Sequence, residues 1–276
     1  MRRILTTVLP LCLSLLLCAC IVAPQEEETE TIEPYDPAAE PEKFEGERLP
    51  LPDYEKEGGW VRVSMAEQVL PGNPDWIVFG SLRYEEGFAV SRADAPEFEV
   101  IRNYCLGSGE NYLFDFDLFT DVAYRGDLSK TDDGFYVGLH LPAMTSVPAT
   151  ADGVWLKFYR NKIAVQGDSL GDFTVFSLPY GVGGVFRRVF IEDLQETGII
   201  NIYVSDNEDT RVLALTLRFF LDEADRTVLR ASSFADGFSS ETNIRKGIHL
   251  YGGGYTKLYN NGNAEVKLRD IAFRAM

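Results

Sequence analysis

Two aspartates separated by one residue, Asp115 and Asp117, come closest in type and spacing to a catalytic pair. They lie in the run 112–119, where strand alternation places both carboxylates on one face and phenylalanines on the other. Carboxylates that cleave a glycosidic bond with retention stand about 5–5.5 Å apart, and the pKa of one is raised. Side chains two residues apart on a strand are separated by about 6.6–7 Å, and short aspartates narrow that gap less readily than glutamates. Hydrolysis by this strand is therefore kept only as an alternative.

A larger group of side chains has the composition of a sugar-binding surface. Alternation in 135–141 and 154–159 places aliphatic residues and phenylalanines on a core face, Leu141 among them, and rings with polar groups on the other face. Rings stack on the C–H faces of sugars, and carboxylates or amides bond to sugar hydroxyls. An ordinary solvated β-face has a similar composition, and both interpretations stay open. The predicted carbohydrate-binding residues are Trp155, Tyr159, Tyr136, His140, Asp115 and Asp117.

Two acidic turns offer oxygen ligands of the kind that Ca²⁺ prefers. They are Asp206-Asn-Glu-Asp209 and Asp132-Asp-Gly134, and neither has the spacing of a dedicated calcium loop. Both are read first as turns between strands, where Asn, Asp and Gly are common. We expect no cofactor and no metal site, with Ca²⁺ at one of these turns as the alternative. Cys105 lies in a Gly/Ser-rich stretch without a nearby histidine and is expected to be a buried or idle thiol rather than a nucleophile.

The chain from Trp60 onward has the texture of an all-β domain. Aromatic and β-branched runs alternate with Gly, Asn and Asp clusters, and no window of a dozen residues has a sustained helical stripe. The helix candidates are short, at 66–70 and 221–225. Many strands without intervening helices indicate an antiparallel sandwich or barrel. Strands are expected at 60–64, 76–84, 87–91, 98–102, 112–124, 134–141, 154–159, 163–166, 173–178, 186–194, 199–205, 211–219, 228–231, 247–251, 257–259 and 264–273.

The N-terminus has the features of an export signal followed by a lipidated cysteine. Arg2 and Arg3 precede an apolar stretch that is too short for a transmembrane helix, which needs roughly 20 residues. The signal ends Leu17-Cys18-Ala19-Cys20, which resembles the lipobox of bacterial lipoproteins, where the cysteine carries the acyl chains. Residues 1–19 are thus predicted to be a lipoprotein signal peptide and Cys20 the lipidation site. An ordinary secretory signal cut near Ala19 is the alternative.

An acidic linker separates this cysteine from the domain. Residues 21–59 hold 13 acidic and 3 basic residues, with abundant Pro and Glu and few large apolar side chains. Such a segment cannot offset the entropy of ordering, so residues 20–59 are predicted to be a disordered spacer and residues 60–276 the folded domain. The whole chain has a net charge of −17, which makes nucleic acid and anionic lipid headgroups poor partners.

A recurring order of strands and tight loops runs through the C-terminal half. Together with the long strand from Tyr112 to Asp121, it resembles the concanavalin A-like lectin/glucanase superfamily, in its laminin-G-like and 3-keto-disaccharide hydrolase-like branches. The resemblance covers about 60–276 and implies a jelly roll of two antiparallel sheets, with carbohydrate bound on the concave face or its rim loops. The stretches that carry it are Ile199-Ile-Asn-Ile-Tyr-Val-Ser-Asp, Val212-Leu-Ala-Leu-Thr-Leu, Gly247-Ile-His-Leu-Tyr-Gly and Val266-Lys-Leu-Arg-Asp-Ile-Ala-Phe.

The same resemblance bears on catalysis. Laminarinase-like members hydrolyse β-glucans with two glutamates in the pattern E-x-D-x-x-E or E-x-D-x-E. Here Asp115-Phe-Asp117-Leu-Phe119 has a phenylalanine where the last acid is needed. The missing acid favours binding over hydrolysis.

These observations predict an all-β protein, an antiparallel jelly-roll β-sandwich preceded by a lipoprotein signal and a disordered acidic linker. We expect a lipoprotein anchored to the bacterial cell envelope on its extracytoplasmic side, binding carbohydrate or another cell-surface polymer. The alternatives are a glycoside hydrolase of the same superfamily and a non-catalytic envelope adaptor. Convergent acids in a closed cleft would favour the enzyme, an open concave sheet the binding protein, and a flat apolar patch the adaptor.

Overall fold

The computed structural model describes residues 36, 47–64, 76–80, 82–91, 97–102, 109–126, 134–150, 152–169, 171–248, 254–261 and 266–276. All of them belong to the compact unit Asp36–Met276. Within these ranges the regular elements are strands and two short 3₁₀ helices, η2 (Pro148–Thr150) and η3 (Phe234–Asp236). The strands form two antiparallel sheets, so the predicted all-β sandwich is confirmed.

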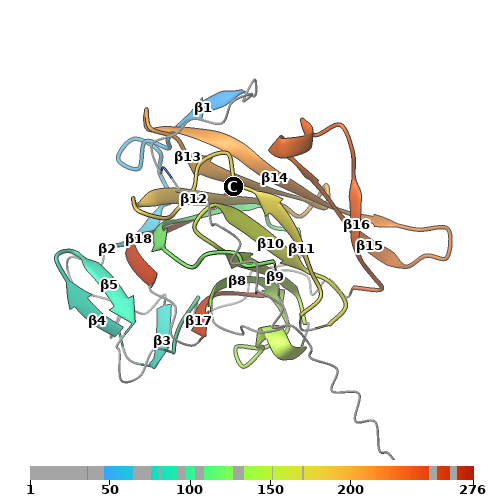
Figure 1. The fold of residues 1–276 in the computed structure, drawn as a ribbon, viewed down its shortest axis with the longest axis horizontal. Helices are drawn as coiled ribbons and strands as arrows, with labels where there is room; N and C mark the ends of the chain where they lie inside the picture. Colours follow the sequence, from blue (N-terminus) through green and yellow to red (C-terminus); the bar gives the residue numbers. More distant parts are fainter. Residues whose placement is uncertain are drawn as a thin grey trace, which may run out of the picture. The chain divides into compact units, whose positions relative to one another are not determined.

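The larger sheet, sheet A, has 11 strands among the described residues. Its order is β16-β15-β14-β13-β12-β7-β18-β5-β4, with β1 added on β14 and β2 on β18. Figure 1 shows β15 and β16 at one end of this sheet and β4 and β5 at the opposite end. Its strands are β1 (Arg48–Pro50), β2 (Val61–Ser64), β4 (Leu82–Glu85), β5 (Phe88–Ser91), β7 (Tyr112–Thr120), β12 (Arg187–Leu194), β13 (Ile199–Ser205), β14 (Thr210–Leu221), β15 (Thr227–Ser233), β16 (Thr242–Lys246) and β18 (Val266–Ala275).

The smaller sheet, sheet B, has seven strands in the described part of the chain, in the order β11-β10-β9-β8-β17-β6-β3. Hairpin connections join β8 through β11, while β17 returns late in the sequence to pair with both β8 and β6. Its strands are β3 (Trp76–Gly80), β6 (Phe98–Arg102), β8 (Gly134–Leu141), β9 (Val154–Phe158), β10 (Lys162–Gln166), β11 (Phe173–Ser177) and β17 (Tyr255–Asn261).

The main core lies between the two sheets and is built from alternate residues of both. Phe116 of β7 meets Phe135 of β8 and Phe158 of β9, with ring centroids 5.8 and 6.2 Å away, and Phe114 packs against Phe116 at 5.3 Å. Edge and tilted contacts of this kind are the preferred geometry of aromatic pairs. The alternation read from the sequence therefore assigns these core positions correctly.

The single strand expected at 76–84 is two strands in different sheets. β3 belongs to sheet B and β4 to sheet A, so the chain changes sheets between Gly80 and Leu82. Gly80 has φ +84°, and a Cβ there would come within 2.4 Å of the Glu97 carbonyl oxygen. Only glycine fits this crossing, because both the positive φ and the close backbone approach exclude a side chain.

Other expected elements also differ at their ends. The helix candidate at 221–225 is the turn between β14 and β15, where the Asp222 carboxylate accepts the backbone N–H groups of Ala224 and Arg226. Aspartate favours such turns over helix interiors for this reason. Strands β1 and β16 were not expected. The helix candidate at 66–70 and most of the strand at 247–251 lie outside the described residues.

Candidate functional site

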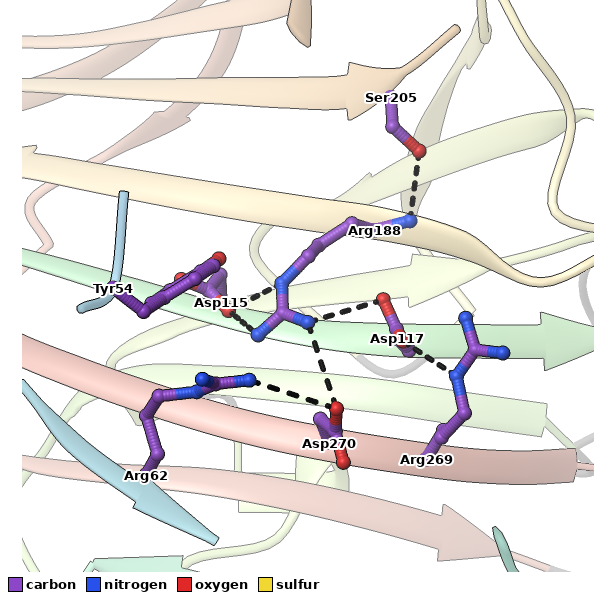
Figure 2. A network of polar contacts seen from close by, with 8 residues as sticks. All are labelled: Tyr54, Arg62, Asp115, Asp117, Arg188, Ser205, Arg269 and Asp270. Carbon is purple, nitrogen blue, oxygen red and sulfur yellow. Dashed lines mark hydrogen bonds and ion pairs between the residues drawn. The ribbon is translucent and has the colours of Figure 1, made fainter. Parts of the chain in front are cut away.

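Asp115 and Asp117 lie on the outer face of sheet A, the face that points away from sheet B. The phenylalanines that alternate with them on β7 belong to the core between the sheets. The Asp115 side chain is 0% exposed. Arg188 donates from Nε to Asp115 Oδ1 at 2.7 Å and also bonds that oxygen through Nη2, while the Tyr54 hydroxyl donates to Oδ2 at 3.0 Å (Figure 2). Asp115 is thus enclosed by its partners.

A β-bulge in β18 brings two further charges beside β7. The pairing with β7 shifts between Leu268 and Ile271, so that Arg269 and Asp270 together stand opposite Asp117. Arg269 Nε donates to Asp117 Oδ2 at 2.8 Å. An extra residue in one strand re-aims its neighbours, which is why both charged side chains reach the same face.

These contacts join into one network, drawn in Figure 2. Arg188 Nη1 lies 3.5 Å from Asp117 Oδ1 and 4.0 Å from Asp270 Oδ2, and Arg62 Nη2 lies 3.8 Å from Asp270 Oδ2. Three carboxylates are therefore balanced by three guanidinium groups. We call this set, with Tyr54, the ion-pair network: Asp115, Asp117, Asp270, Arg62, Arg188 and Arg269.

The electrostatics of the ion-pair network favour a structural role for Asp115 over a catalytic one. Burial raises the pKa of Asp115 to about 6, although the charge and hydrogen bonds of Arg188 and the bond from Tyr54 favour the ionised form. Burial also raises the pKa of Tyr54, with the Asp115 charge adding to it, so the hydroxyl keeps its proton and donates it. A catalytic acid must reach its substrate. Both Asp115 oxygens already have partners inside the protein, so this carboxylate holds Arg188 in place.

Residues 47–60, here called the strap, cross the outer face of sheet A. β1 pairs with β14 at one side, and β2, which follows the strap, pairs with β18 at the other. Arg48 Nη1 donates to Asp206 Oδ2 at 2.6 Å, and Tyr54 reaches the network. The strap also contributes to a small apolar cluster of Leu113, Phe190, Tyr203, Leu49, Leu51, Trp60 and Leu213.

The strap moves the start of the folded domain, which composition places at Trp60, toward the N-terminus. Residues 47–59, assigned to the disordered linker, are packed on the sandwich. Composition misses this because the acidic residues around them dominate the average. The few apolar side chains suffice once a sheet face is present to receive them.

Three half-buried phenylalanines gather beside the network. Phe88 of β5 and Phe119 of β7 both pack against Phe186, with ring centroids 5.6 and 5.9 Å from it. Lys267 Nζ lies 4.6 Å from the centroid of Phe119 and 5.4 Å from that of Phe88, and Arg269 Cζ lies 4.8 Å from that of Phe186. These are cation–π distances. We call the five residues the phenylalanine patch.

The strand register explains why the patch forms. Phe119 is paired with Lys267 on β18, which is paired with Val90 on β5, so neighbouring strands present these side chains in one row. Arg269 belongs to both the patch and the ion-pair network. In the sequence, alternation already places Phe119 on the face of Asp115 and Asp117. Phe88 and Phe186 carry no such signal, because only the strand order brings them there.

Three predicted binding residues lie on the outer face of sheet B. Trp155 is 1% exposed, and Tyr136 and Tyr159 are equally enclosed. Trp155 packs with Tyr136 in a small cluster on that face and meets Tyr259 edge-on at 6.4 Å. Their rings present no open face to a ligand in this structure. Their part in carbohydrate binding stays a prediction.

His140 does not share a face with Tyr136, and this part of the alternation is wrong. Its φ is +54°, and the pairing of β8 with β17 shifts nearby. The imidazole consequently turns into the space between the sheets, where Nε2 lies 2.7 Å from Asp193 Oδ2. Leu141, expected in the core, packs in the outer cluster of sheet B instead. A Cβ at Gly254 would lie 2.6 Å from the His140 carbonyl carbon, so glycine permits this approach.

The six predicted residues thus fall in three places and do not form one site. The two aspartates lie outside sheet A, the three aromatic residues outside sheet B, and His140 between the sheets. The phenylalanine patch, which adjoins the aspartates, is where half-exposed rings and charged groups meet on one surface.

The acidic turn at 206–209 is engaged within the protein. Asp206 accepts the backbone N–H groups of Glu208 and Thr210 and the guanidinium of Arg48. Within the described ranges, no group of three or more His, Cys, Asp or Glu residues could hold a metal ion. Calcium at 132–134 stays a prediction, since Asp132 and its neighbour lie outside those ranges, as do Cys20 and Cys105. None of the helices in the described part of the chain is long and apolar enough to span a membrane.

No family model matches the sequence, and no curated protein matches it. Among solved structures, peanut lectin with a 9-residue peptide is similar over 79% of this chain and 97% of its own, with 12% identity and a TM-score of 0.48. The VIP36 exoplasmic/lumenal domain in its Ca²⁺/Man3GlcNAc-bound form aligns over 74% of this chain and 84% of its own, with 9% identity and a TM-score of 0.47. The Emp47p carbohydrate recognition domain aligns over 88% of this chain and 99% of its own, with 12% identity and a TM-score of 0.46.

Identities and TM-scores this low carry no information about the ligand of this chain. The expected sandwich of two antiparallel sheets is shown by the strand pairing of the chain itself.

Proposed function

We propose that the chain is an exported lipoprotein, anchored through Cys20, whose sandwich binds carbohydrate of a cell-surface polymer at the phenylalanine patch. The observation that carries the proposal is the set of three half-exposed rings held side by side on one sheet face. Aromatic rings flanked by hydrogen-bonding side chains suit sugars, which have apolar C–H faces and polar edges.

The composition of the patch favours a saccharide over a protein partner. A docking surface for another protein is depleted of charge at its centre. Here Lys267 and Arg269 stand against the rings, and the ion-pair network adjoins them. Binding is favoured over hydrolysis because the buried acid beside the patch, Asp115, is enclosed by Arg188 and Tyr54.

Two features of the sequence support the lipid anchor: the stretch Leu17-Cys18-Ala19-Cys20 and the acidic segment that follows it. A single acyl chain gives weak membrane binding, whereas two or more give a stable anchor. A domain held in this way at the outer side of a membrane would meet cell-surface polymers directly.

A glycan array probed with the full chain in detergent tests the binding proposal. For any glycan bound, Phe186→Ala should weaken affinity by about five- to hundredfold, because a stacked ring contributes on the order of 1–3 kcal/mol. Phe220→Ala is the matched control, since Phe220 is also half-buried under an arginine, Arg230, at 4.0 Å. Its affinity should stay unchanged.

Thermal melting of both variants separates lost binding from lost folding. Product analysis of the bound glycan then distinguishes binding from cleavage. The proposal fails if no glycan is bound, or if both variants bind as well as the wild type. Cleaved product would favour the hydrolase alternative.

A further inference from the structure

We infer that Asp117 is a positioning residue of the phenylalanine patch: it fixes Arg269 against Phe186 and thereby holds this ring in the orientation that receives the saccharide. The inference rests on the proposed function and deepens it at the same site. The carboxylate acts through Arg269 rather than by touching the saccharide.

Phe186 depends on side-chain contacts for its orientation more than the other two rings do. Phe88 and Phe119 lie within β5 and β7, whose ladders fix the direction of each side chain. Phe186 lies just before β12, after the run Tyr180-Gly-Val-Gly-Gly-Val. Gly184 in this run has φ +75°, a conformation that favours glycine, so the chain reaches Phe186 from an irregular turn. The ring is consequently held by the side chains that pack on it.

Arg269 provides the polar contact that holds this ring. Its Cζ lies 4.8 Å from the centroid of Phe186, which is a cation–π distance. Phe88 and Phe119 pack on the same ring at interplanar angles of 50° and 51°. Apolar packing is non-directional, whereas a guanidinium that is fixed at its other side favours one position of the ring. The orientation of Phe186 therefore follows that of Arg269.

Arg269 is in turn held by Asp117. The side chain of Arg269 is 50% exposed, and an arginine with that freedom samples several rotamers unless a partner fixes it. Here Nε donates to Asp117 Oδ2 at 2.8 Å (Figure 2). The other oxygen of this buried carboxylate, Oδ1, lies 3.5 Å from Arg188 Nη1, so the carboxylate is held from two sides. Asp117 thus sets the direction in which the Arg269 guanidinium reaches Phe186.

A ring that is held in advance binds a saccharide with a smaller loss of entropy. Ordering one mobile side chain on binding lowers affinity by about three- to tenfold. The contacts from Asp117 through Arg269 to Phe186 remove this loss before the saccharide arrives.

A second group of the same composition lies elsewhere on the chain and serves as a matched control. Arg230 Nη1 donates to Glu241 Oε2 at 3.2 Å, and Arg230 Cζ lies 4.0 Å from the centroid of Phe220. Phe220 and Arg230 belong to β14 and β15, which contribute no residue to the phenylalanine patch. Truncating Glu241 therefore perturbs a carboxylate, an arginine and a ring outside the patch.

Fluorine NMR of the full chain in detergent tests the effect on the ring. 4-Fluorophenylalanine is placed at position 186 or, in a second sample, at position 220. Asp117→Ala should shift and broaden the resonance from position 186, because Arg269 loses the partner that fixes it. Glu241→Ala should leave that resonance unchanged and alter the one from position 220. Arg269→Lys, at a half-exposed position that tolerates substitution, removes the guanidinium and should act like Asp117→Ala.

Isothermal titration with a glycan bound in the array tests the effect on binding. Asp117→Ala should weaken affinity about three- to tenfold, and it should cause no further loss in a chain that already carries Phe186→Ala. A purely structural role would weaken both backgrounds equally, so this double-mutant cycle isolates the effect that passes through the ring. Glu241→Ala should leave the affinity unchanged, and melting curves establish that each variant is folded.

The possible results separate the inference from the function it rests on. An unchanged resonance from position 186 in both Asp117→Ala and Arg269→Lys overturns the inference, as does equal weakening with and without the Phe186 ring. Glycan binding that needs Phe186 but not Asp117 overturns the inference and leaves the proposed function standing. Absence of binding to every glycan overturns both, whatever the resonance shows.

Discussion

Arg188 is paired in register with Asp117, yet it makes its shorter hydrogen bonds to Asp115, two residues along the neighbouring strand. The guanidinium thus lies diagonally across the β7–β12 ladder and touches both carboxylates on one face. Diagonal neighbours on adjacent strands are within reach of long side chains such as arginine. This position makes Arg188 the link between the enclosed acid and the exposed patch.

Replacing Arg188 should therefore destabilise the domain strongly. Arg188→Met leaves Asp115 buried beside the Tyr54 hydroxyl but without its guanidinium partner, and removing one member of a buried pair costs about 3–5 kcal/mol. Arg218→Met is the matched control, because Arg218 is 55% exposed in its ion pair with Glu241. The Arg218 variant should lose less than about 1 kcal/mol of unfolding free energy. Urea denaturation measures both, and similar losses would show that Arg188 has no special structural weight.

Asp115 should make stability depend on pH in an unusual direction. Its pKa in the folded chain is about 6, raised from 3.8 by burial, so between about pH 4 and 6 the folded state binds a proton that the unfolded state has released. Stability should consequently fall as pH rises through this window, by up to about 3 kcal/mol. Asp115→Asn cannot titrate, so the difference between the two proteins in urea midpoints from pH 4 to 7 isolates this effect. Parallel profiles would exclude it.

Trp155→Ala should cost about 3–5 kcal/mol, because the ring is buried among other side chains on sheet B and its removal leaves a cavity. Measuring glycan affinity in the same variant tests its predicted part in binding. A variant that melts like the wild type but binds glycan more weakly would show that the ring is a ligand platform after all.

Two truncations should separate the strap from the rest of the acidic segment. Removing 21–46 deletes sequence with little apolar area and should change the melting midpoint only slightly. Removing 21–57 also deletes β1, the Arg48–Asp206 ion pair and the Tyr54–Asp115 hydrogen bond, and should lower the midpoint by several degrees. Equal midpoints in the two truncations would mean that the strap adds nothing.

Cys20→Ser should prevent acylation, because the thiol is the proposed acceptor of the lipid. The wild-type chain should partition into the detergent phase of a phase-separating mixture and the variant into the aqueous phase. Identical partitioning of the two would rule out a lipid on Cys20.

Alternation in the sequence is a reliable guide wherever the ladder is regular. It places Asp115, Asp117 and Trp155 on outer faces because β7 pairs with β12, and β9 pairs with β8, without any shift in register there. It fails at His140 and Leu141, where a left-handed residue and a register shift invert the remaining side chains. A single-residue irregularity changes every later face assignment on the strand.

The candidate site is less predictable than the fold, because it depends on which strands become neighbours. Phe119 is visible in the sequence beside two aspartates. Phe88, Phe186 and Arg269 join it only through the order β12-β7-β18-β5, which no local pattern encodes. The strap is missed for a related reason, since Tyr54 gains its role from a partner 61 residues away.

The strap has a mechanical consequence for the anchored lipoprotein proposed above. Tension along the tether would load β1 first, where three residue pairs on β14 and the Arg48–Asp206 contact resist it. If these yield, the pull next reaches Tyr54, whose release would free one oxygen of Asp115 and loosen the grip on Arg188. The sandwich core would remain outside this load path until β2 is drawn from β18. Tension on the proposed anchor would in this way disturb the surface next to the phenylalanine patch before it unfolded the sandwich.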